Sequence, residues 1–391
     1  MRPTRAEVDL SAIQENVRQA VRLAGAAQVM AVVKADAYGH GVVPVARTAL
    51  SAGAAWLGVA VPEEGVLLRQ AGLSCPILVL GPTPPEQADI SAEHGLDQCV
   101  SDAAQILPLN EAGRTHERTI AVHLKVDTGM GRVGIPPAEA AAIAERILAA
   151  PALRLAGLMT HLAEAEGEDL AFTAGQLARF REAARAVQAI RGLRPLLHAA
   201  NSAGLLYHPA ARLDLVRPGI MLYGCPPRGT PQPDDPPLRP ALRFRTAVSQ
   251  VKTVPAGTRL SYGRTFVTRR QTRVATLPVG YADGFWRALS NAGVVLIQGR
   301  RVPIVGRVCM DMTLVDATEI PEVRPGDEAV LIGRQGDAEI TADEVAAQLG
   351  TISYEVLCRI GPRVPRTYLP AHFYDGSHPA KCLDKPDGPP L

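Results

Sequence analysis

One pattern repeats along residues 28–218, and it limits the possible folds more than any other feature of the chain. Short runs of apolar and β-branched residues alternate with alanine-, leucine- and arginine-rich segments of helical length. The runs are QVMAVVKA, WLGVAV, PILVLG, LDQCVS, IAVHLKVD, LRLAGLMTH, PLLHAANS and LDLVRPG. Strands that alternate with helices form a parallel sheet, and eight such units are the number that closes a (β/α)8 barrel. We therefore predict an N-terminal TIM-like barrel.

The pattern changes after the last of these runs. Residues 225–240, CPPRGTPQPDDPPLRP, have the composition of a proline-rich linker. Short strand-like runs separated by turn residues come next, and they predict a C-terminal domain rich in β-strands. The predicted parts are residues 1–10, a strand that joins the β domain; 11–232, the barrel; 233–370, the β domain; and 371–391, a loosely ordered tail with little apolar periodicity.

Charge and cysteine content exclude several classes of function. Lys plus Arg number 41 and Asp plus Glu 39, so the chain has no basic surplus for nucleic acid or for a membrane surface. No run reaches the roughly 18 apolar residues of a membrane span, and the N-terminal residues lack the apolar core of a signal peptide. Six cysteines without C-x-x-C spacing predict neither a disulfide framework nor a metal site. We expect a cytoplasmic protein.

Lys34 directly follows an apolar strand in AVVKADAYGHG. In barrels of this type the active site lies at the carboxyl ends of the strands, which is where Lys34 is expected. Desolvation lowers the pKa of a lysine amine and favours Schiff-base chemistry with an aldehyde. A lysine that merely extends its stem out of the strand end fits the position as well. Both interpretations remain open on this residue alone.

The stretch IAVHLKVDTGMGR places further polar side chains at a strand end. Strand alternation puts His123, Lys125 and Asp127 on one face and the apolar residues between them on the other. The apolar face is expected to pack under the helices, so the polar face would point into the barrel. The glycine-rich turn would then bring Arg132 to the site. A plain inward layer of salt bridges is the alternative.

The last strands predict an anion site. Arg217 leaves the eighth strand in VRPGIMLYG, and Gly219 and Ile220 follow with backbone N–H groups. A phosphate site built by the last loops recurs in such barrels. Asn201 and Ser202 stand at a strand-to-helix junction, where they are either a helix cap or part of that anion site.

A lysine suited to aldehyde chemistry, combined with a phosphate site, indicates pyridoxal 5′-phosphate as the cofactor. His161, at another strand end, is either a core histidine or a catalytic group. In the β domain, Tyr262, Tyr281 and Tyr354 are by themselves typical strand and hairpin tyrosines.

Taken together, these motifs closely resemble the alanine racemase family, whose members are fold-type III pyridoxal-phosphate enzymes. The motifs that carry the resemblance stand in the family's order and spacing: AVVKADAYGHG, HLKVDTGMGRVG, THLAEAE, HAANSAG, RPGIMLYG, SYGRTF, VGYADGF, GRVCMDM and YEVLCRI. The resemblance covers roughly residues 5–369, and so both domains. Trp286 is a local departure, because a proline or smaller residue is expected there, near Tyr281.

The resemblance implies interconversion of L- and D-alanine by two catalytic bases, Lys34 and Tyr262. Lys34 also holds the cofactor, and Arg217 contacts its pyridine nitrogen. Further cofactor-binding residues implied by the resemblance are Tyr38, His161, Asn201, Ser202, Gly219, Ile220 and Tyr354. The substrate carboxylate is assigned to Arg132 and the Met310 backbone N–H, and supporting positions to Lys125, Tyr281 and Asp311.

The resemblance also implies a homodimer whose active sites are shared between subunits, and D-alanine production for peptidoglycan. Lys125 is often carbamylated in this family and then pairs with Arg132. Arg217 suits the reaction, because an arginine yields no proton to the pyridine nitrogen. The ring then stays a weak electron sink, so that a short-lived carbanion is reprotonated rather than diverted to transamination.

Three other functions were weighed against this one. A racemase of broader specificity, which accepts serine, remains open from the sequence. A decarboxylase of basic amino acids on the same scaffold would place a carboxylate near the pyridine nitrogen, where this chain has Arg217. A pyridoxal-phosphate homeostasis protein that is not an enzyme would consist of the barrel alone, without the β domain that carries Tyr262 and Met310.

Overall fold

The computed structural model describes residues 2–167 and 169–369, so the predicted tail at 371–391 lies outside the described residues. The chain forms two compact units. The barrel unit comprises Ile13–Ala37 and Val42–Leu238. The β-rich unit comprises the residues up to Ala12, the short segment Tyr38–Gly41 and the residues from Arg239 onward.

The barrel unit contains one eight-stranded parallel sheet in the order β8-β7-β6-β5-β4-β3-β2-β9. The strands are β2 (Gln28–Val32), β3 (Trp56–Val59), β4 (Ile77–Val79), β5 (Asp97–Val100), β6 (Ile120–Lys125), β7 (Leu153–Met159), β8 (Leu196–His198) and β9 (Leu215–Val216). The Asp214 N–H donates to the carbonyl of Leu197, in β8, and the Arg217 N–H donates to the carbonyl of Ala200, just after β8, each over 2.9 Å. These bonds join β8 and β9, the two end strands of the sheet. The predicted barrel is confirmed.

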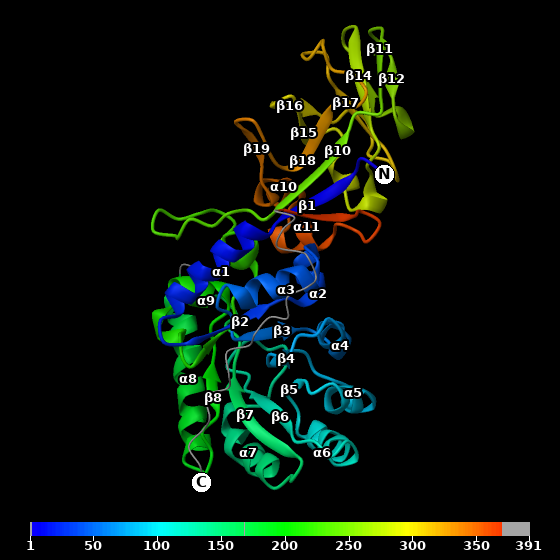
Figure 1. Cartoon of the computed structure of the whole chain (residues 1–391). Helices are drawn as coiled ribbons and strands as arrows, with labels where there is room; N and C mark the ends of the chain where they lie inside the picture. Colours follow the sequence, from blue (N-terminus) through cyan, green and yellow to red (C-terminus); the bar gives the residue numbers. More distant parts are fainter. Residues whose placement is uncertain (1, 168, 370–391) are drawn as a thin grey trace. The chain divides into compact units, whose positions relative to one another are not determined.

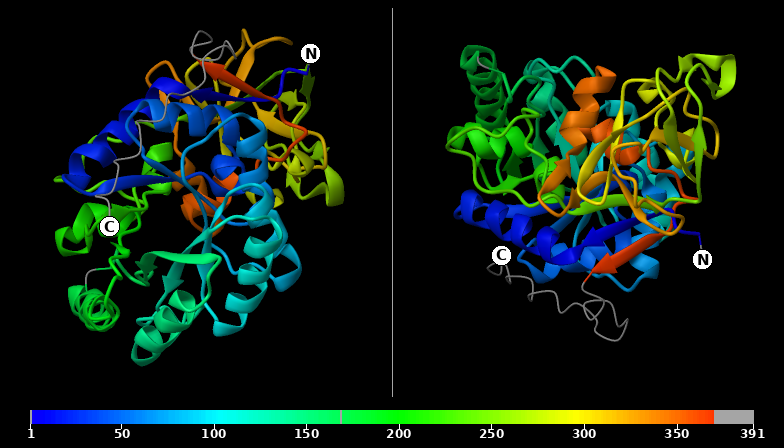
Figure 2. Two further views of the ribbon diagram at one scale, coloured as in Figure 1. Left: turned by 60° about the horizontal axis from the view of Figure 1, so that its bottom comes forward. Right: turned by 90° about the horizontal axis from the view of Figure 1, so that it is seen from above.

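Helices follow the strands and lie outside them (Figures 1 and 2). They are α1 (Leu10–Ala24), α3 (Val42–Ser51), α4 (Pro62–Gln70), α5 (Ala88–Glu93), α6 (Ile106–Thr115), α7 (Ala140–Leu148), α8 (Leu170–Gln188) and α9 (Ser202–Tyr207). With helices outside and side chains filling the interior, the barrel strands are buried on both faces, which explains their continuous apolar runs. One interior cluster takes a residue from each of six strands: Met30, Trp56, Leu78, Cys99, Met159 and Leu215.

The β-rich unit contains three sheets. The largest has the order β16-β15-β18-β10-β1-β20, with β19 paired to β18, and the others have the orders β11-β14-β17 and β12-β13. The strands are β1 (Arg5–Asp9), β10 (Leu242–Ala247), β11 (Gln250–Val254), β12 (Arg259–Leu260), β13 (Phe266–Val267), β14 (Thr272–Leu277), β15 (Val294–Ile297), β16 (Arg300–Pro303), β17 (Thr313–Asp316), β18 (Glu328–Gln335), β19 (Ala338–Ile340) and β20 (Arg366–Leu369). Strand β1 lies antiparallel to β10 and parallel to β20.

Two short helices, α10 (Ala342–Leu349) and α11 (Ser353–Cys358), complete the β-rich unit. Thr341 caps α10, because its hydroxyl accepts the backbone N–H of Glu344 over 2.9 Å. The predicted strand-rich second region is confirmed. Among the described residues, no helix combines the length and the apolar character that a membrane span requires.

Candidate active site

Lys34 stands two residues after β2 and is half-buried. The turn that it begins, α2 (Lys34–Gly39), winds left-handed, because Ala35, Asp36, Ala37 and Tyr38 have φ between 52° and 54°. Each such residue costs roughly 1–2 kcal/mol relative to the right-handed form. Consecutive strained residues of this kind persist only where the surroundings enforce them, and they concentrate at functional sites.

Two carboxylates within the barrel unit hold this strained turn. Glu64, in the first turn of α4, accepts the backbone N–H of Ala35 on one oxygen at 2.6 Å and that of Ala60 on the other at 2.7 Å. Asp36 accepts the backbone N–H of Val42 at 2.7 Å. Glu64 was not predicted from the sequence, because a glutamate in a first helical turn is ordinary and nothing in its spacing links it to Lys34.

Lys125, the last residue of β6, is only 4% exposed. Burial lowers the pKa of its amine, and the charges of Arg132 and Arg217 lower it further. Burial also raises the pKa of the Cys99 thiol to about 11, so this neighbour carries no negative charge at neutral pH. Lys125 forms no ion pair in the part of the chain that the structure describes. The surroundings of Lys125 therefore favour an added anion.

Asp127 serves the turn that follows β6. Its carboxylate accepts the backbone N–H groups of Gly129, Met130 and Gly131 over 2.9–3.1 Å. Burial alone would raise the pKa of Asp127, but these hydrogen bonds outweigh it and lower the pKa. The turn leads to Arg132, which is exposed and whose charge acts on both Lys125 and His161.

Arg217, directly after β9, is 4% exposed, and burial lowers the pKa of its guanidinium to about 10. Nη1 lies 3.0 Å from Nδ1 of His198, and Nη2 donates to the carbonyls of Thr160 at 2.7 Å and Ala199 at 3.1 Å. Its Nε–H donates to no acceptor among the described residues. Arg217 is therefore a cation of fixed position whose Nε–H is among the donors that no described residue accepts.

His161 is half-buried, and Nη2 of Arg217 lies 3.5 Å from its Nδ1. Burial lowers the pKa of His161 to about 3, and the charges of Arg217, Lys125, Arg132 and Lys34 add to the effect. The ring is therefore neutral at pH 7. Gln176, fully buried on α8, fixes this loop by donating to the His161 carbonyl at 3.1 Å and accepting the Ala163 N–H at 2.9 Å.

The sequence left two roles open for Asn201 and Ser202, a helix cap and part of an anion site, and each of the two residues is suited to one of them. Asn201 caps α9, because its side chain accepts the backbone N–H of Gly204 at 2.8 Å. The buried Ser202 hydroxyl accepts the Gly219 N–H at 2.8 Å, which ties α9 to the loop after β9. Ile220 begins the turn Ile220–Tyr223 in this loop. The loop residues expected to bind phosphate, Ser202, Gly219 and Ile220, therefore meet in one place.

In the β-rich unit, Tyr38 and Tyr354 lie together, with ring centroids 5.9 Å apart. Tyr38 is 7% exposed, and burial raises the pKa of its phenol, so the hydroxyl stays protonated and can donate. Gly39 follows with φ of 80°, and a Cβ added there would lie 2.6 Å from the Leu357 carbonyl oxygen. Glycine is therefore required where Tyr38–Gly41 passes α11.

Tyr262, Tyr281 and Met310 are exposed by 72%, 39% and 53%. Hydrogen bonds connect the loops that carry them: Ser261 Oγ donates to the Arg307 carbonyl at 2.7 Å, and the Tyr281 N–H donates to the Cys309 carbonyl at 3.0 Å. Ser261 adopts φ 59° and ψ −177°, a region almost confined to glycine. The loop is strained next to a tyrosine that its own unit leaves exposed.

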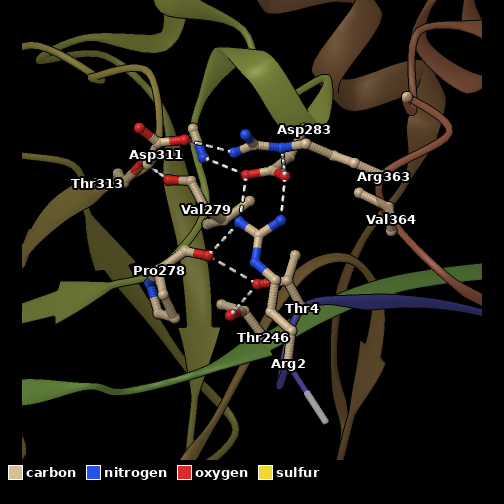
Figure 3. Close-up of polar contacts among 12 residues, drawn as sticks. Arg2, Thr4, Thr246, Pro278, Val279, Asp283, Asp311, Thr313, Arg363 and Val364 are labelled. Carbon is tan, nitrogen blue, oxygen red and sulfur yellow. Dashed lines mark hydrogen bonds and ion pairs between the residues drawn. The ribbon is translucent and has the colours of Figure 1, made fainter.

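A buried carboxylate supports these loops (Figure 3). Asp283 accepts two hydrogen bonds from Arg2, at 2.5 and 2.7 Å, and one from Arg363 at 2.6 Å. Oδ2, which also accepts one of the Arg2 bonds, accepts the Gly280 N–H at 3.0 Å, and this fixes the turn that carries Tyr281. Arg363 also donates to Asp311 at 2.6 Å, so Asp311 belongs to this framework. Asp283 and Arg2 were not predicted from the sequence.

Trp286 packs against a neighbouring side chain and does not stand freely at an entry to the site. Its ring packs under the guanidinium of Arg359, whose carbon lies 5.0 Å from the ring centroid. The indole Nε1 is buried without an acceptor among the described residues.

The barrel unit thus gathers Lys34, Lys125, Arg132, His161 and Arg217 closely enough for their charges to act on one another. The β-rich unit gathers Tyr38 with Tyr354, and Tyr262 with Tyr281, Met310 and Asp311. A parallel barrel with cations at the carboxyl ends of its strands, joined to a strand-rich unit, defines a barrel enzyme that binds an anionic ligand.

Comparisons with known proteins identify the family. The family model described as "Alanine racemase, N-terminal domain" matches residues 8–227, and the model described as "Alanine racemase, C-terminal domain" matches residues 241–368. Alanine racemase of Symbiobacterium thermophilum is 51% identical over 370 residues, 94% of this chain and 97% of that relative. The chain belongs to the alanine racemase family.

Solved structures agree with this result. The crystal structure of alanine racemase from D-cycloserine-producing Streptomyces lavendulae superposes with a TM-score of 0.89 at 39% identity, and covers 96% of this chain and 99% of that one. Alanine racemase from Bartonella henselae, solved with covalently bound pyridoxal phosphate, has a TM-score of 0.85 at 30% identity, and the match covers 94% and 100% of the two chains.

Proposed function

We propose that this chain interconverts L- and D-alanine with pyridoxal 5′-phosphate, using Lys34 and Tyr262 as the two bases. The single observation that carries the proposal is Arg217, a buried guanidinium at a strand end with an Nε–H left free for an acceptor. Family membership over nearly the whole chain supports the same reaction.

The residues present fit the cofactor. The spare Nε–H of Arg217 suits an aromatic ring nitrogen, which is an acceptor. Lys34, on a turn whose strain is held by Glu64, is the amine that would hold the cofactor covalently. The phosphate would be held by the hydroxyls of Tyr38, Tyr354 and Ser202 and by the N–H groups of Gly219 and Ile220. Asn201 caps the helix that carries Ser202, and its role is to position it.

When bound, the cofactor withdraws electrons from the α-carbon of the amino acid and so makes its proton removable. Racemisation needs that proton taken from one face and a proton returned on the other. We assign one face to Lys34 Nζ and the other to the Tyr262 hydroxyl. Arg132 and the Met310 N–H orient the carboxylate of alanine, and Tyr281 lines the entry. Arg217 would donate to the ring nitrogen without giving it a proton, and His161, whose ring is neutral, lies beside Arg217.

Lys125 is assigned a supporting role as a carbamate. Its buried amine attacks carbon dioxide, a C–N bond forms, and one proton leaves to solvent, which produces an anion. That anion would compensate the neighbouring cations and hold Arg132 in place for the substrate carboxylate.

A contrast in exposure supports the proposal of a homodimer with shared sites. Tyr262 is 72% exposed, and a base in open solvent has no fixed geometry. Tyr281 and Met310, on neighbouring loops, are exposed as well. We therefore assign this face to a second copy of the chain, so that Tyr262 serves the partner's barrel.

Substrate and cellular role extend the proposal. Alanine is the substrate, and a racemase that also accepts serine is the alternative. D-Alanine would supply peptidoglycan from the cytoplasm, where cysteines outside disulfides, such as Cys75, Cys99, Cys225, Cys309 and Cys358, would stay reduced. Residues 11–232 and 233–370 are proposed as the two domains, with the strand at 1–10 in the second.

Two measurements test the proposal. The purified chain, loaded with pyridoxal 5′-phosphate and incubated with L-alanine, should form D-alanine on chiral chromatography. Borohydride reduction of the loaded protein should fix the cofactor on the Lys34 peptide. An amine with carbon dioxide as the product would mean a decarboxylase, no product a binding protein, and cofactor on another lysine would overturn the assignment.

A further inference from the structure

A chain of buried polar groups leads away from Arg217 through the barrel unit, and the proposed roles do not use it. Nη1 of Arg217 lies 3.0 Å from Nδ1 of His198. Nε2 of His198 lies 2.8 Å from Nδ1 of His123, and Nε2 of His123 lies 3.6 Å from an Asp97 carboxylate oxygen. Both imidazoles are fully buried. His198 ends β8 and Asp97 begins β5, so this row of polar groups crosses the barrel from the carboxyl end of its strands to their amino end.

The guanidinium determines which ring nitrogen is protonated in His198 and in His123. Arginine has donors only, so Nδ1 of His198 must accept and carries no proton. The His198 proton is then on Nε2, where it can only be donated to Nδ1 of His123. His123 in turn carries its proton on Nε2, facing Asp97. The N–H bonds of both rings therefore point the same way, away from the cation and toward the carboxylate, and the two aligned hydrogen bonds from Arg217 to His198 and from His198 to His123 strengthen one another.

The surrounding packing holds the two rings in this geometry. A β-bulge between Val122 and His123 brings His123 opposite Gly157. A Cβ added at Gly157 would lie 2.1 Å from His123 Nδ1, so a glycine is needed to make room for the ring. The Trp56 ring meets His123 edge-on, with centroids 5.5 Å apart, and the two imidazole planes are 83° apart.

We propose that His198, His123 and Asp97 are positioning residues that orient the Arg217 guanidinium through two hydrogen bonds of one direction, from Arg217 to His198 and from His198 to His123, with the Asp97 carboxylate 3.6 Å beyond His123 as an electrostatic contact. By occupying Nη1, His198 fixes the plane of the guanidinium, and this fixes the direction of the free Nε–H. This inference rests on the proposed function only in that the free donor serves the cofactor ring. The direction of the chain itself follows from donors and acceptors within the protein.

The direction can be measured without any catalytic assay. In the holoenzyme labelled with ¹⁵N in histidine, His198 and His123 should both show a protonated Nε2 and an unprotonated Nδ1 at neutral pH. His198→Asn and His123→Gln, each of which removes one set of signals, provide the assignments. A protonated Nδ1 on either residue would overturn the proposal, whatever the enzyme catalyses.

A second measurement tests the effect on Arg217. Loosening this residue should raise transamination, in which the amino group of alanine stays on the cofactor and pyruvate is released. The readout is pyruvate formed per racemisation event in the holoenzyme, a ratio that does not change when only the active fraction falls. His198→Leu removes the acceptor, and the ratio should rise roughly tenfold, the effect of one hydrogen bond to a charged group.

Two further variants separate positioning from loss of fold. His198→Asn keeps an acceptor oxygen near the Nδ1 position, and its ratio should stay within about twofold of wild type. His208→Leu removes another buried histidine of the barrel unit, whose side chain hydrogen-bonds, among the described residues, only to the Ala165 carbonyl, at 2.9 Å, and it should leave the ratio unchanged. Equal ratios for His198→Leu and wild type would overturn the positioning role. A chain that does not racemise alanine at all would instead remove the proposed function and leave the proton directions to stand.

Discussion

The two units prepare their candidate groups in opposite ways. In the barrel unit, Lys125 and Arg217 are almost fully buried, and Arg217 has its orientation fixed by the chain's own carbonyls and a histidine. In the β-rich unit, Tyr262 and Met310 are more than half exposed, although the loops beneath them are tied down by Ser261 and Asp283. Hydrogen bonds hold the backbone of these loops in place, but the described residues of that unit leave the side chains of Tyr262 and Met310 largely uncovered.

This difference in burial shows which candidate groups lie in a low-dielectric environment within their own unit. Burial alters the pKa values of Lys125, His161 and Arg217 within a single barrel. Buried electrostatics of this kind are strong and need no reorganisation during the reaction. The exposed groups of the β-rich unit lack such an environment within that unit, and under the proposed function a second copy of the chain supplies it.

Mixing two inactive variants would give the largest effect. Lys34→Ala and Tyr262→Phe should each lower activity by about a thousandfold or more, because each removes a catalytic base. Unfolded and refolded together, the two chains should form mixed dimers as half of the population. Each mixed dimer carries one site with both defects and one with neither, so roughly a quarter of all sites should be intact. The measurement is racemase activity of the mixture against each variant refolded alone.

The result distinguishes the two possible sources of Tyr262. If both bases came from one chain, every site in the mixture would keep one defect and no activity would return. Subunit exchange must be verified separately, for example with chains that carry different affinity tags. Absence of recovery after verified exchange would show that Tyr262 serves its own barrel.

Reversing the charge of Arg217 should have the next largest effect. Arg217→Glu places a carboxylate at the ring nitrogen, which favours a protonated, stronger electron sink. Racemisation should fall about a hundredfold, and pyruvate should accumulate during turnover with alanine. Chiral chromatography and a pyruvate assay on the same sample measure both. A variant that loses racemisation without forming pyruvate would show that Arg217 does not control the fate of the proton.

Acid should weaken the barrel unit before the β-rich unit. Folded His161 has a pKa of about 3 and folded His198 one well below 6.5, so below pH 6.5 the unfolded chain binds protons that the folded barrel does not. Their stabilisation is complete above pH 6.5 and declines as the pH falls, by about 1.4 kcal/mol per pH unit for each group. The effect of Asp283 has the same sign, because its pKa is lowered as well, but it starts from 3.8, so the stabilisation by Asp283 declines only below that pH.

Each unit contains one of the two tryptophans, so the two acid transitions can be observed separately. Trp56 lies in the barrel unit and Trp286 in the β-rich unit. In Trp286→Phe the fluorescence reports the barrel, and its urea midpoint should fall between pH 6.5 and 4. In Trp56→Phe it reports the β-rich unit, whose midpoint should hold until about pH 4. Midpoints that fall together over the whole range would contradict the separation.

Removing the Lys125 amine should have a smaller, recoverable effect. Lys125→Ala eliminates the proposed carbamate, and Arg132 then loses the anion that holds it. Activity should fall about tenfold, chiefly through a higher KM for alanine. Small carboxylates in solution should restore part of it, whereas neutral amides of the same size should not. Full activity in carbon-dioxide-free buffer, with an unmodified lysine by mass spectrometry, would refute the role.

The sequence predicted the residues at the strand ends but not the groups that hold them. Lys34, Arg217 and Ser202 could be identified because glycine-rich turns and strand periodicity mark them. Glu64, Gln176 and His198 act through tertiary contacts with segments distant in the chain, and local patterns carry no trace of such contacts. The left-handed turn after Lys34 was unexpected for the same reason, since none of Ala35, Asp36, Ala37 and Tyr38 is a glycine.

The smallest predicted effect tests whether that turn is held by both oxygens of one carboxylate. Glu64 accepts the Ala35 N–H on one oxygen and the Ala60 N–H on the other. Glu64→Gln keeps the shape but replaces one acceptor with an amide N–H2, which faces a backbone N–H. One of the two bonds is lost, and the strained residues after Lys34 can relax.

Racemisation by Glu64→Gln should fall several-fold, and the cofactor should dissociate several-fold faster, because a hydrogen bond to a partly exposed charge contributes about 1 kcal/mol. Glu63→Gln is the matched control, one position earlier on the same helix, where the carboxylate accepts, among the described residues, a hydrogen bond only from the half-buried Gln87 side chain at 2.9 Å. The control should keep wild-type kinetics. Equal cofactor release from both variants would mean that the turn keeps its left-handed form without Glu64, and the barrel would then be rigid enough by packing alone to present Lys34.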